Sequence, residues 1–459
     1  MTFKFTRLLA VTAIALFCSV CAIAQPHLPP GYFWKKLPNG LEVVVIENAK
    51  VPLATIEIAV KNGAYTEGPE YSGLSHFFEH MFFKSNKDYP SQEKFIKRTQ
   101  ELGAIWNGTT DVERVNYYFT FYKDSLKAGL QLMNAAIRYP LFREDDMKTE
   151  RPVVDGEFQR AESDPGFNLY FEMQKKLWGD LITRKNSIGI HEVINSATAE
   201  QMNIIKNKYY LPNNSLLTIC GDVKHEDAFA LADAIYGDWA GSGEDPHKKY
   251  PVPPFKTLAK SEAFIKEMSI AQTPSMQFSW QGPAYSTDSA ATIAADLFHT
   301  IVNLNSSKMQ QALVDKGLAS SAGISYTTTH YTGSIDLSVS PNPDKIKECY
   351  IELMHQISLL GRADYYTDEQ LKNAKAVLMR SNIRAKEKPS ALPDQVSSNW
   401  CSTSLDYYTN LGENYQKVTR ADIKRYTDTY LVGKPMISGL MISPEMSKQY
   451  KVASFFVAK

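Results

Sequence analysis

Residues 73–84 have the sequence Gly-Leu-Ser-His-Phe-Phe-Glu-His-Met-Phe-Phe-Lys, and this stretch decides how the rest of the chain is interpreted. Its apolar residues recur at helical spacing, which predicts a helix over residues 73–83. On a helix, residues four apart lie on the same face, so His76 and His80 direct both imidazoles toward one point. The spacing therefore predicts two ligands of a metal ion, and zinc is the metal that such ligands suit.

Glu79 follows His76 by three residues, so it lies close enough to that face to take a proton from a water at the metal. It is the candidate general base. A catalytic zinc also needs a third protein ligand and an open position for water. Glu150 and Glu157 lie seven residues apart, two turns along one face of a predicted helix, and Glu157 is the candidate third ligand. Two histidines and a glutamate suit zinc without excluding cobalt or manganese.

The alternative is an ordinary core or surface helix whose histidines are satisfied by hydrogen bonds. That alternative must also account for the two downstream carboxylates. The order His-x-x-Glu-His is the inverse of the His-Glu-x-x-His pattern of many zinc peptidases and is the inverzincin signature.

The segments around the motif predict strands interleaved with long helices. Residues 40–60 hold two β-branched runs joined by a turn-prone stretch at residues 48–52, which predicts antiparallel strands. Apolar residues at helical spacing predict further helices over residues 91–102, 123–138 and 143–162. Ser91 and Asp124 are candidate helix caps. This alternation indicates an α+β fold with helices packed on one face of an antiparallel sheet.

An internal repeat divides the chain, which at 459 residues is too long for one typical domain. Residues 198–209 are echoed by residues 419–430, each a Thr-capped helix followed by a β-rich run. We expect two homologous domains, residues 32–240 with the metal site and residues 255–459 without it. The Gly-, Pro- and charge-rich residues 241–254 form the expected linker.

The composition excludes several classes of protein. The chain has 50 Lys plus Arg and 50 Asp plus Glu, so no net field attracts nucleic acid or an anionic membrane. A hydrophobic content of 44% matches a soluble globular protein rather than a disordered or collagen-like one. Beyond the N-terminal region, the cysteines Cys220, Cys349 and Cys401 are odd in number and widely spaced, which argues against a disulfide framework or thiol chemistry.

The N-terminus has the pattern of a secretory signal peptide over residues 1–24. Lys4 and Arg7 precede an apolar run, residues 8–20, and residues 22–24 form an Ala-Ile-Ala cleavage site. The run is short for a membrane span of roughly 20 residues. We therefore expect an exported protein, periplasmic or secreted, with no stable membrane anchor.

The chain resembles the pitrilysin family, which includes insulin-degrading enzyme and mitochondrial processing peptidase. The stretches that carry the resemblance are residues 37–41, 73–84, 103–118, 140–142 and 221–223, and the pair Glu150 and Glu157. The resemblance implies one zinc per chain, held by His76, His80 and Glu157, with Glu79 as the catalytic base and Glu150 supporting the site. It implies a zinc endopeptidase whose two domains face each other across a cleft and whose substrates are peptides or unfolded segments.

Residues 103–111 and 115–121 resemble the family's strand beside the metal, which pairs with an extended substrate. A substrate bound as an added strand is held mainly through its backbone hydrogen bonds rather than its side chains, which suits a peptidase of broad specificity. Asn107 is the candidate substrate contact. Its alternative role is that of a turn residue before Gly108.

The second half lacks a copy of the metal motif. Its equivalent region, residues 297–300, has only His299 and no acidic neighbour, so His299 is expected to be an ordinary satisfied histidine. Active members of the family carry an Arg and a Tyr in this half, but Val314 stands at the Arg position and Ser320 or Ser321 at the Tyr position. We therefore expect a homologous partner subunit that supplies both residues. The alternative is a non-catalytic peptide-binding or scaffold subunit.

Overall fold

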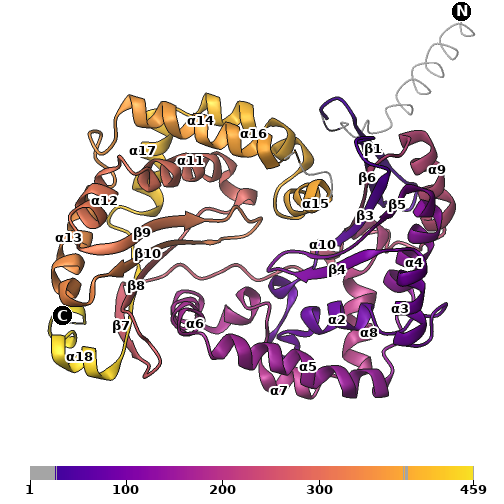
Figure 1. Ribbon diagram of the computed structural model, residues 1–459, viewed down its shortest axis with the longest axis horizontal. Helices are drawn as coiled ribbons and strands as arrows, with labels where there is room; N and C mark the ends of the chain where they lie inside the picture. Colours follow the sequence, from indigo (N-terminus) through magenta and orange to yellow (C-terminus); the bar gives the residue numbers. More distant parts are fainter. Residues whose placement is uncertain (1–25, 27, 386, 388–390, 458–459) are drawn as a thin grey trace, which may run out of the picture.

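The computed structural model describes residue 26, residues 28–385, residue 387 and residues 391–457. The expected signal peptide lies outside these residues. The chain forms two mixed α/β halves, each built on one sheet, which face each other (Figure 1). This architecture confirms the α+β class with two domains. Within the described ranges, no helix combines the length and apolar character needed to cross a membrane.

The first sheet has the strand order β1-β2-β6-β3-β5-β4. Its strands are β1 (Tyr32–Lys36), β2 (Glu42–Glu47), β3 (Leu53–Val60), β4 (Ile105–Thr110), β5 (Val115–Tyr122) and β6 (Ser215–Gly221). All neighbours pair antiparallel except β2 and β6, which are parallel. Strand β4 lies at the edge of the sheet.

The second sheet repeats this order without a counterpart of β1 and runs β7-β11-β8-β10-β9. Its strands are β7 (Glu262–Glu267), β8 (Ser275–Gln281), β9 (Ala319–Tyr326), β10 (Ser334–Pro341) and β11 (Ile437–Ile442). The parallel pair recurs as β7 and β11. The helices before β6 and β11 both begin with a capping box, on Thr198 and Thr419. The internal repeat expected from the sequence is therefore a structural repeat.

The helices of the first half are α2 (Leu74–Phe82), α3 (Gln92–Glu101), α4 (Leu126–Arg138), α5 (Glu144–Glu162), α6 (Pro165–Trp178), α7 (His191–Asn195), α8 (Ala199–Tyr209) and α9 (His225–Tyr236). The short α10 (Pro246–Lys249) lies in the proposed linker. The second half has α11 (Tyr285–Asn303), α12 (Lys308–Gln310), α13 (Ile346–Leu359), α14 (Asp368–Ala385), α15 (Leu392–Ser402), α16 (Leu405–Lys417), α17 (Arg420–Tyr430), α18 (Pro444–Tyr450) and α19 (Ala453–Phe456).

Two local expectations need correction. Strands β2 and β3 run in opposite directions as expected, but they do not pair with each other because β6 lies between them. Ser91 caps α3 by accepting the Lys94 N–H at 3.3 Å. Asp124 does not cap α4, because Lys123–Ser125 form a short 3-10 turn and the helix begins only at Leu126.

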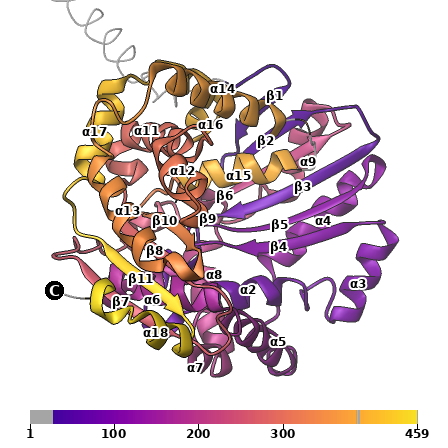
Figure 2. The ribbon, with the colours of Figure 1, turned by 60° about the vertical axis from the view of Figure 1, so that its left-hand side comes forward.

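Each half contributes one helix to the other half's sheet. Helices therefore cover both faces of each sheet, not one face as the sequence suggested. Helix α15 packs its apolar side on β3 and β6, and α6 packs on β8 and β11. Figures 1 and 2 show α15 beside the first sheet, and Figure 1 shows α6 beside the second. Gly439 of β11 permits this contact, because a Cβ there would lie 2.7 Å from Met173 Sδ of α6. The two halves therefore share cores.

A buried ionic cluster fastens α15 to the first sheet. The Arg114 guanidinium pairs with Asp394 at 2.8 Å and donates to Ser397 Oγ at 2.8 Å. It also lies 3.9 Å from the carboxylate of Glu57, a fully enclosed residue of β3. Burial raises the pKa of Glu57 to about 7, although the charge of Arg114 acts to lower it. Arg114 is thus the main charge that compensates Glu57.

Replacing Arg114 should destabilise the chain strongly. Arg114→Leu leaves the Glu57 carboxylate without a cation, and breaking a buried pair in this way typically costs about 3–5 kcal/mol of unfolding free energy. Urea denaturation followed by circular dichroism measures the loss. The control Arg362→Leu removes an exposed arginine paired with Asp364 and should cost about 1 kcal/mol or less.

The double variant Arg114→Leu/Glu57→Gln should recover part of the loss, because it removes the uncompensated carboxylate as well. Equal stability of the single and double variants would contradict the assigned role of Glu57.

Candidate metal centre

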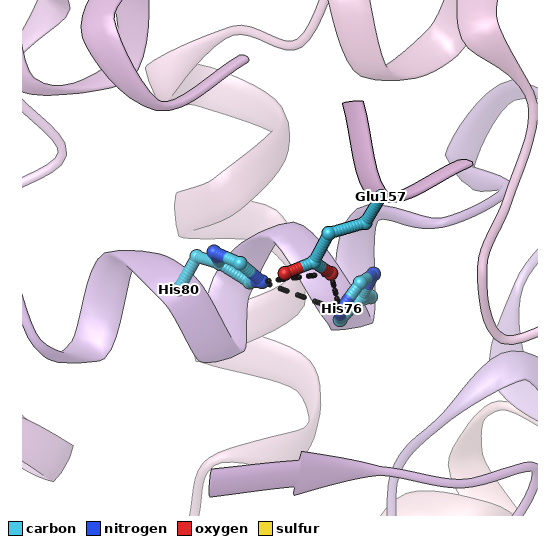
Figure 3. A group of neighbouring side chains, drawn as sticks. All are labelled: His76, His80 and Glu157. Carbon is cyan, nitrogen blue, oxygen red and sulfur yellow. Dashed lines mark hydrogen bonds and ion pairs between the residues drawn. The ribbon is translucent and has the colours of Figure 1, made fainter. Parts of the chain in front are cut away.

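Three side chains converge between α2 and α5. His76 and His80 project from one face of α2, and Glu157 reaches toward them from α5 (Figure 3). The two Nε2 atoms lie 3.3 Å apart. One carboxylate oxygen of Glu157 lies 3.4 Å from His76 Nε2 and 3.6 Å from His80 Nε2. The structure thus brings the three predicted ligands together.

The separations suit a tetrahedral metal ion. Zinc binds histidine nitrogen and carboxylate oxygen at about 2.0–2.1 Å, and a tetrahedron with such arms separates its corners by about 3.3–3.4 Å. The three observed separations lie in or just above that range. Two nitrogens and one oxygen from the protein leave a fourth corner open, which is the arrangement of catalytic rather than structural zinc sites.

Glu79 faces the strand beside this cluster rather than joining it. One of its carboxylate oxygens accepts a hydrogen bond from Thr110 Oγ1 of β4 at 2.7 Å. Gly108 of the same strand permits the approach, because a Cβ there would lie 2.8 Å from Glu79 Cγ. Burial raises the pKa of Glu79, and the hydrogen bond from Thr110 only partly opposes this effect. A carboxylate with a raised pKa can both accept and return a proton near neutral pH.

Glu150 contacts His80 at Nδ1, the ring nitrogen that faces away from His76 and Glu157. Its Oε1 lies 2.8 Å from His80 Nδ1, and its other oxygen pairs with Lys84. Proton donation from Nδ1 to this carboxylate leaves the Nε2 lone pair of His80 directed at Glu157 and His76. A carboxylate that orients a histidine in this way is a common second layer of metal sites.

The two imidazoles have different electrostatic surroundings. Burial, together with the neighbouring His80, lowers the pKa of His76 to about 4, so its imidazole is uncharged at neutral pH and has a ring lone pair for a metal ion. Burial also opposes protonation of His80, but the hydrogen bond to Glu150 and the charges of Glu157 and Glu79 outweigh it and raise its pKa. The carboxylates around His80 therefore favour a positive charge at this position.

Sequence reasoning missed the residues that hold the start of α2. The buried Glu67 carboxylate accepts the N–H groups of Gly73 and Ser75, each at 2.7 Å. Gly73 has a φ of 90°, and its Cβ would lie 2.6 Å from Gly189 Cα. Gly73 and Gly189 thus pack backbone against backbone. The sequence offered one sign of this arrangement: Gly73 stands directly before α2, and glycine is the residue that adopts a positive φ most readily.

Asn107 does not join the cluster. It lies on the edge strand β4 with an exposed side chain. Neighbouring residues of a strand point to opposite faces, and Gly108 contacts Glu79, so Asn107 points to the other face. The turn alternative is wrong, because residues 105–110 are all strand. A substrate contact of Asn107 stays a prediction.

The second half provides no comparable cluster among the described residues. His299 is buried in α11, where its Nε2 lies 2.8 Å from the hydroxyl of Tyr426, as expected of a satisfied histidine. One further group of possible ligands, Glu47, His225 and Glu226, lies in the first half. Its third member, Glu226, is exposed.

The sequence matches two family models in order along the chain. Insulinase (Peptidase family M16) matches residues 42–176, and Peptidase M16 inactive domain matches residues 196–378. Together they extend over more than half of the chain. An uncharacterized zinc protease of Rickettsia felis is 23% identical over 368 residues, which cover 80% of this chain and 87% of the relative.

Solved structures with the same fold are also peptidases. A protease from Helicobacter pylori superposes with a TM-score of 0.80 at 20% identity, over 91% of this chain and 100% of that one. The periplasmic protease PqqL from Escherichia coli gives 0.75 at 16% identity, over 93% of this chain but 49% of that one. These matches confirm the resemblance seen in the sequence, and this chain belongs to the M16 family of peptidases, which includes insulin-degrading enzymes.

Proposed function

We propose that this protein is a zinc-dependent endopeptidase that hydrolyses peptides or unfolded segments. The observation that carries the proposal is the convergence of His76, His80 and Glu157 at separations that suit zinc, with Glu79 beside them. One zinc per chain would be held by His76 Nε2, His80 Nε2 and the Glu157 carboxylate. Relatives named zinc proteases support this assignment.

Bound zinc would supply Lewis acidity, which polarises the scissile carbonyl and lowers the pKa of water from about 15.7 toward 7. Glu79 takes the proton from the attacking water and passes it to the leaving amine. Thr110 fixes the carboxylate of Glu79 through its 2.7 Å hydrogen bond. Glu150, with Lys84 as its counter-ion, keeps His80 in the required tautomer.

The edge strand β4 is the proposed substrate platform. Its outer backbone groups can pair with an extended peptide, and Thr110 and Gly108 bring that peptide alongside Glu79. Asn107 lies on the same strand and is proposed as a substrate contact. The relative PqqL is described as periplasmic, which supports the proposed signal peptide and export of this chain.

We propose further that the chain works with a homologous subunit. Val314 lies in the short helical segment Gln311–Asp315, and Ser320 and Ser321 lie on β9, so this chain offers no Arg or Tyr at those positions. A donor at that position would therefore come from another subunit. PqqL, of which this chain covers 49%, supports an assembly of two such halves.

The second candidate is a non-catalytic peptide-binding or scaffold subunit. The residues at Val314 and Ser320 favour it if the chain acts alone. The complete set of His76, His80, Glu157 and Glu79 favours catalysis. A neighbouring gene for a similar chain that has the Arg and Tyr but lacks the metal motif would support the heterodimer.

Glu79→Gln should keep one equivalent of zinc and lose peptidase activity by about a hundredfold or more, because the side chain moves protons without binding metal. Zinc is measured by atomic absorption, and activity by cleavage of a quenched fluorescent peptide. Thr110→Val, which removes only the hydrogen bond to Glu79, should keep zinc and lose less activity. Zinc loss in Glu79→Gln as large as in His80→Ala would contradict the role of Glu79.

Glu157→Gln should weaken zinc binding more than Glu150→Gln, because the first removes a ligand and the second only the support of His80. Loss of such outer support typically weakens metal affinity by about 10- to 100-fold. Competition with a chromogenic chelator ranks the two variants. The reverse ranking would exchange the roles of Glu150 and Glu157.

The isolated chain should be poorly active even when loaded with zinc. Loss of one preorganised oxyanion donor typically costs about a hundredfold in rate, and this chain has neither the Arg nor the Tyr. Light scattering after size exclusion, with kinetics on the same fractions, should give low activity alone and high activity with the homologous subunit. Full activity of a lone monomer or homodimer would rule out the partner.

A further inference from the structure

A cavity of 420 Å³ lies between the two halves. Its walls come from the β4–β5 turn at residues 111–114, from α6 and α15, and from the β9–β10 region of the second half. This volume is in the range of about 300–1,000 Å³ typical of ligand sites. The side chains of Tyr170 and Trp178, both on α6, supply aromatic surface to it.

The cations that line this cavity are already engaged. Arg114 is held by Asp111 and Asp394. Lys185 donates to the carbonyl of Thr332 at 2.5 Å, and its ammonium lies 5.0 Å from the centre of the Trp178 ring. In the described part of the chain, neither cation forms an ion pair with the third carboxylate of the cavity wall, Asp336.

The cavity carboxylates differ in their partners. Asp111 pairs with Arg114. Glu113 accepts hydrogen bonds from the N–H groups of His330 and Tyr331. The positive charge of Lys185 also acts to lower the pKa of Glu113. Asp336, on β10, accepts only from uncharged groups: Ser279 Oγ at 2.5 Å, Ser334 Oγ at 2.6 Å and Gln277 Nε2 at 3.1 Å.

No Lys, Arg or His of the described ranges forms an ion pair with Asp336. Burial raises the pKa of Asp336, which its three hydrogen bonds only partly oppose. A cationic ligand gains binding free energy by pairing with a partly buried carboxylate that has no cation of its own and lies at the wall of a cavity.

We propose that this cavity is a specificity subsite that binds the cationic side chain of a lysine or arginine in the substrate, with Asp336 as its counter-ion. The subsite rests on the proposed peptidase function. Tyr170 packs against the apolar stem of the bound side chain, and Trp178, whose ring already faces the Lys185 ammonium, adds apolar surface. Ser334, hydrogen-bonded to Asp336, holds the carboxylate in place.

The position of the cavity along the chain connects it to the metal centre. Thr110, which binds Glu79, is the last residue of β4, and the turn that lines the cavity begins at Asp111. Strands advance by about 3.3 Å per residue, so a peptide paired with β4 reaches the cavity within a few residues of the bond that is cut. The lysine or arginine of the substrate is therefore expected always on the same side of the bond that is cut.

Peptide binding to the Glu79→Gln chain, which does not turn over, tests the subsite. The probes are N-acetylated, dye-labelled peptides with a single arginine moved stepwise along the sequence, each matched with norleucine at the same position. Acetylation removes the terminal amine as a competing cation. Fluorescence anisotropy should give about tenfold tighter binding of the arginine peptide at one position, the gain expected of a charge-assisted hydrogen bond.

Adding Asp336→Asn should reduce that preference to about twofold or less and leave the norleucine peptide's affinity unchanged, which also verifies the fold. The matched control Asp344→Asn removes an exposed carboxylate just beyond the other end of β10 and should keep the preference. Equal binding of the paired peptides, no measurable binding, or a preference that survives Asp336→Asn overturns the subsite. Hydrolysis is scored separately, with the unsubstituted, zinc-loaded chain and its homologous subunit together: cleavage without an arginine preference contradicts the subsite alone, and a binding preference without cleavage contradicts the peptidase function alone.

Discussion

The structure depends on one constraint: two imidazoles and a carboxylate must be held with their ligand atoms 3.3–3.6 Å apart. A single turn of α2 fixes His76 relative to His80, so the remaining freedom lies in how α2 and α5 pack together. Glu150 and Lys84 limit that freedom from one side. Glu67 limits it at the start of α2 by holding the backbone of Gly73 and Ser75. These buried polar contacts therefore hold α2 and α5 in position relative to each other.

The second half contributes by packing rather than by ligands. Helices α6 and α15 are exchanged between the sheets, and Arg114 joins the first sheet to α15. Because each half completes the core of the other, the cavity at residues 111–114 has walls from both. The edge strand β4 thus leads from Glu79 at one end of the site to a shared cavity at the other.

The sequence revealed the parts of this arrangement that are local. His76 and His80 could be paired because helical spacing alone puts them on one face, and Thr198 and Thr419 could be recognised because a capping box lies within four residues. The partnership of Glu157 with the histidines needed the family resemblance, since it joins two helices far apart in the chain.

Long-range contacts were not predictable from such patterns. The insertion of β6 between β2 and β3 leaves no trace in three strands that are all largely apolar. The exchange of α6 and α15 has no local signature either, because an amphipathic helix does not specify which sheet it covers. The hydrogen bond from Thr110 to Glu79 and the carboxylate of Asp336 without a cation likewise depend on tertiary contacts.

We propose that this fold positions a single metal ion between α2 and α5. Anomalous diffraction at the zinc absorption edge, from crystals grown with zinc, locates that ion directly. We expect one strong peak within coordination distance of His76 Nε2, His80 Nε2 and the Glu157 carboxylate. A peak found only at Glu47, His225 and Glu226, or none at the α2–α5 site, would contradict it.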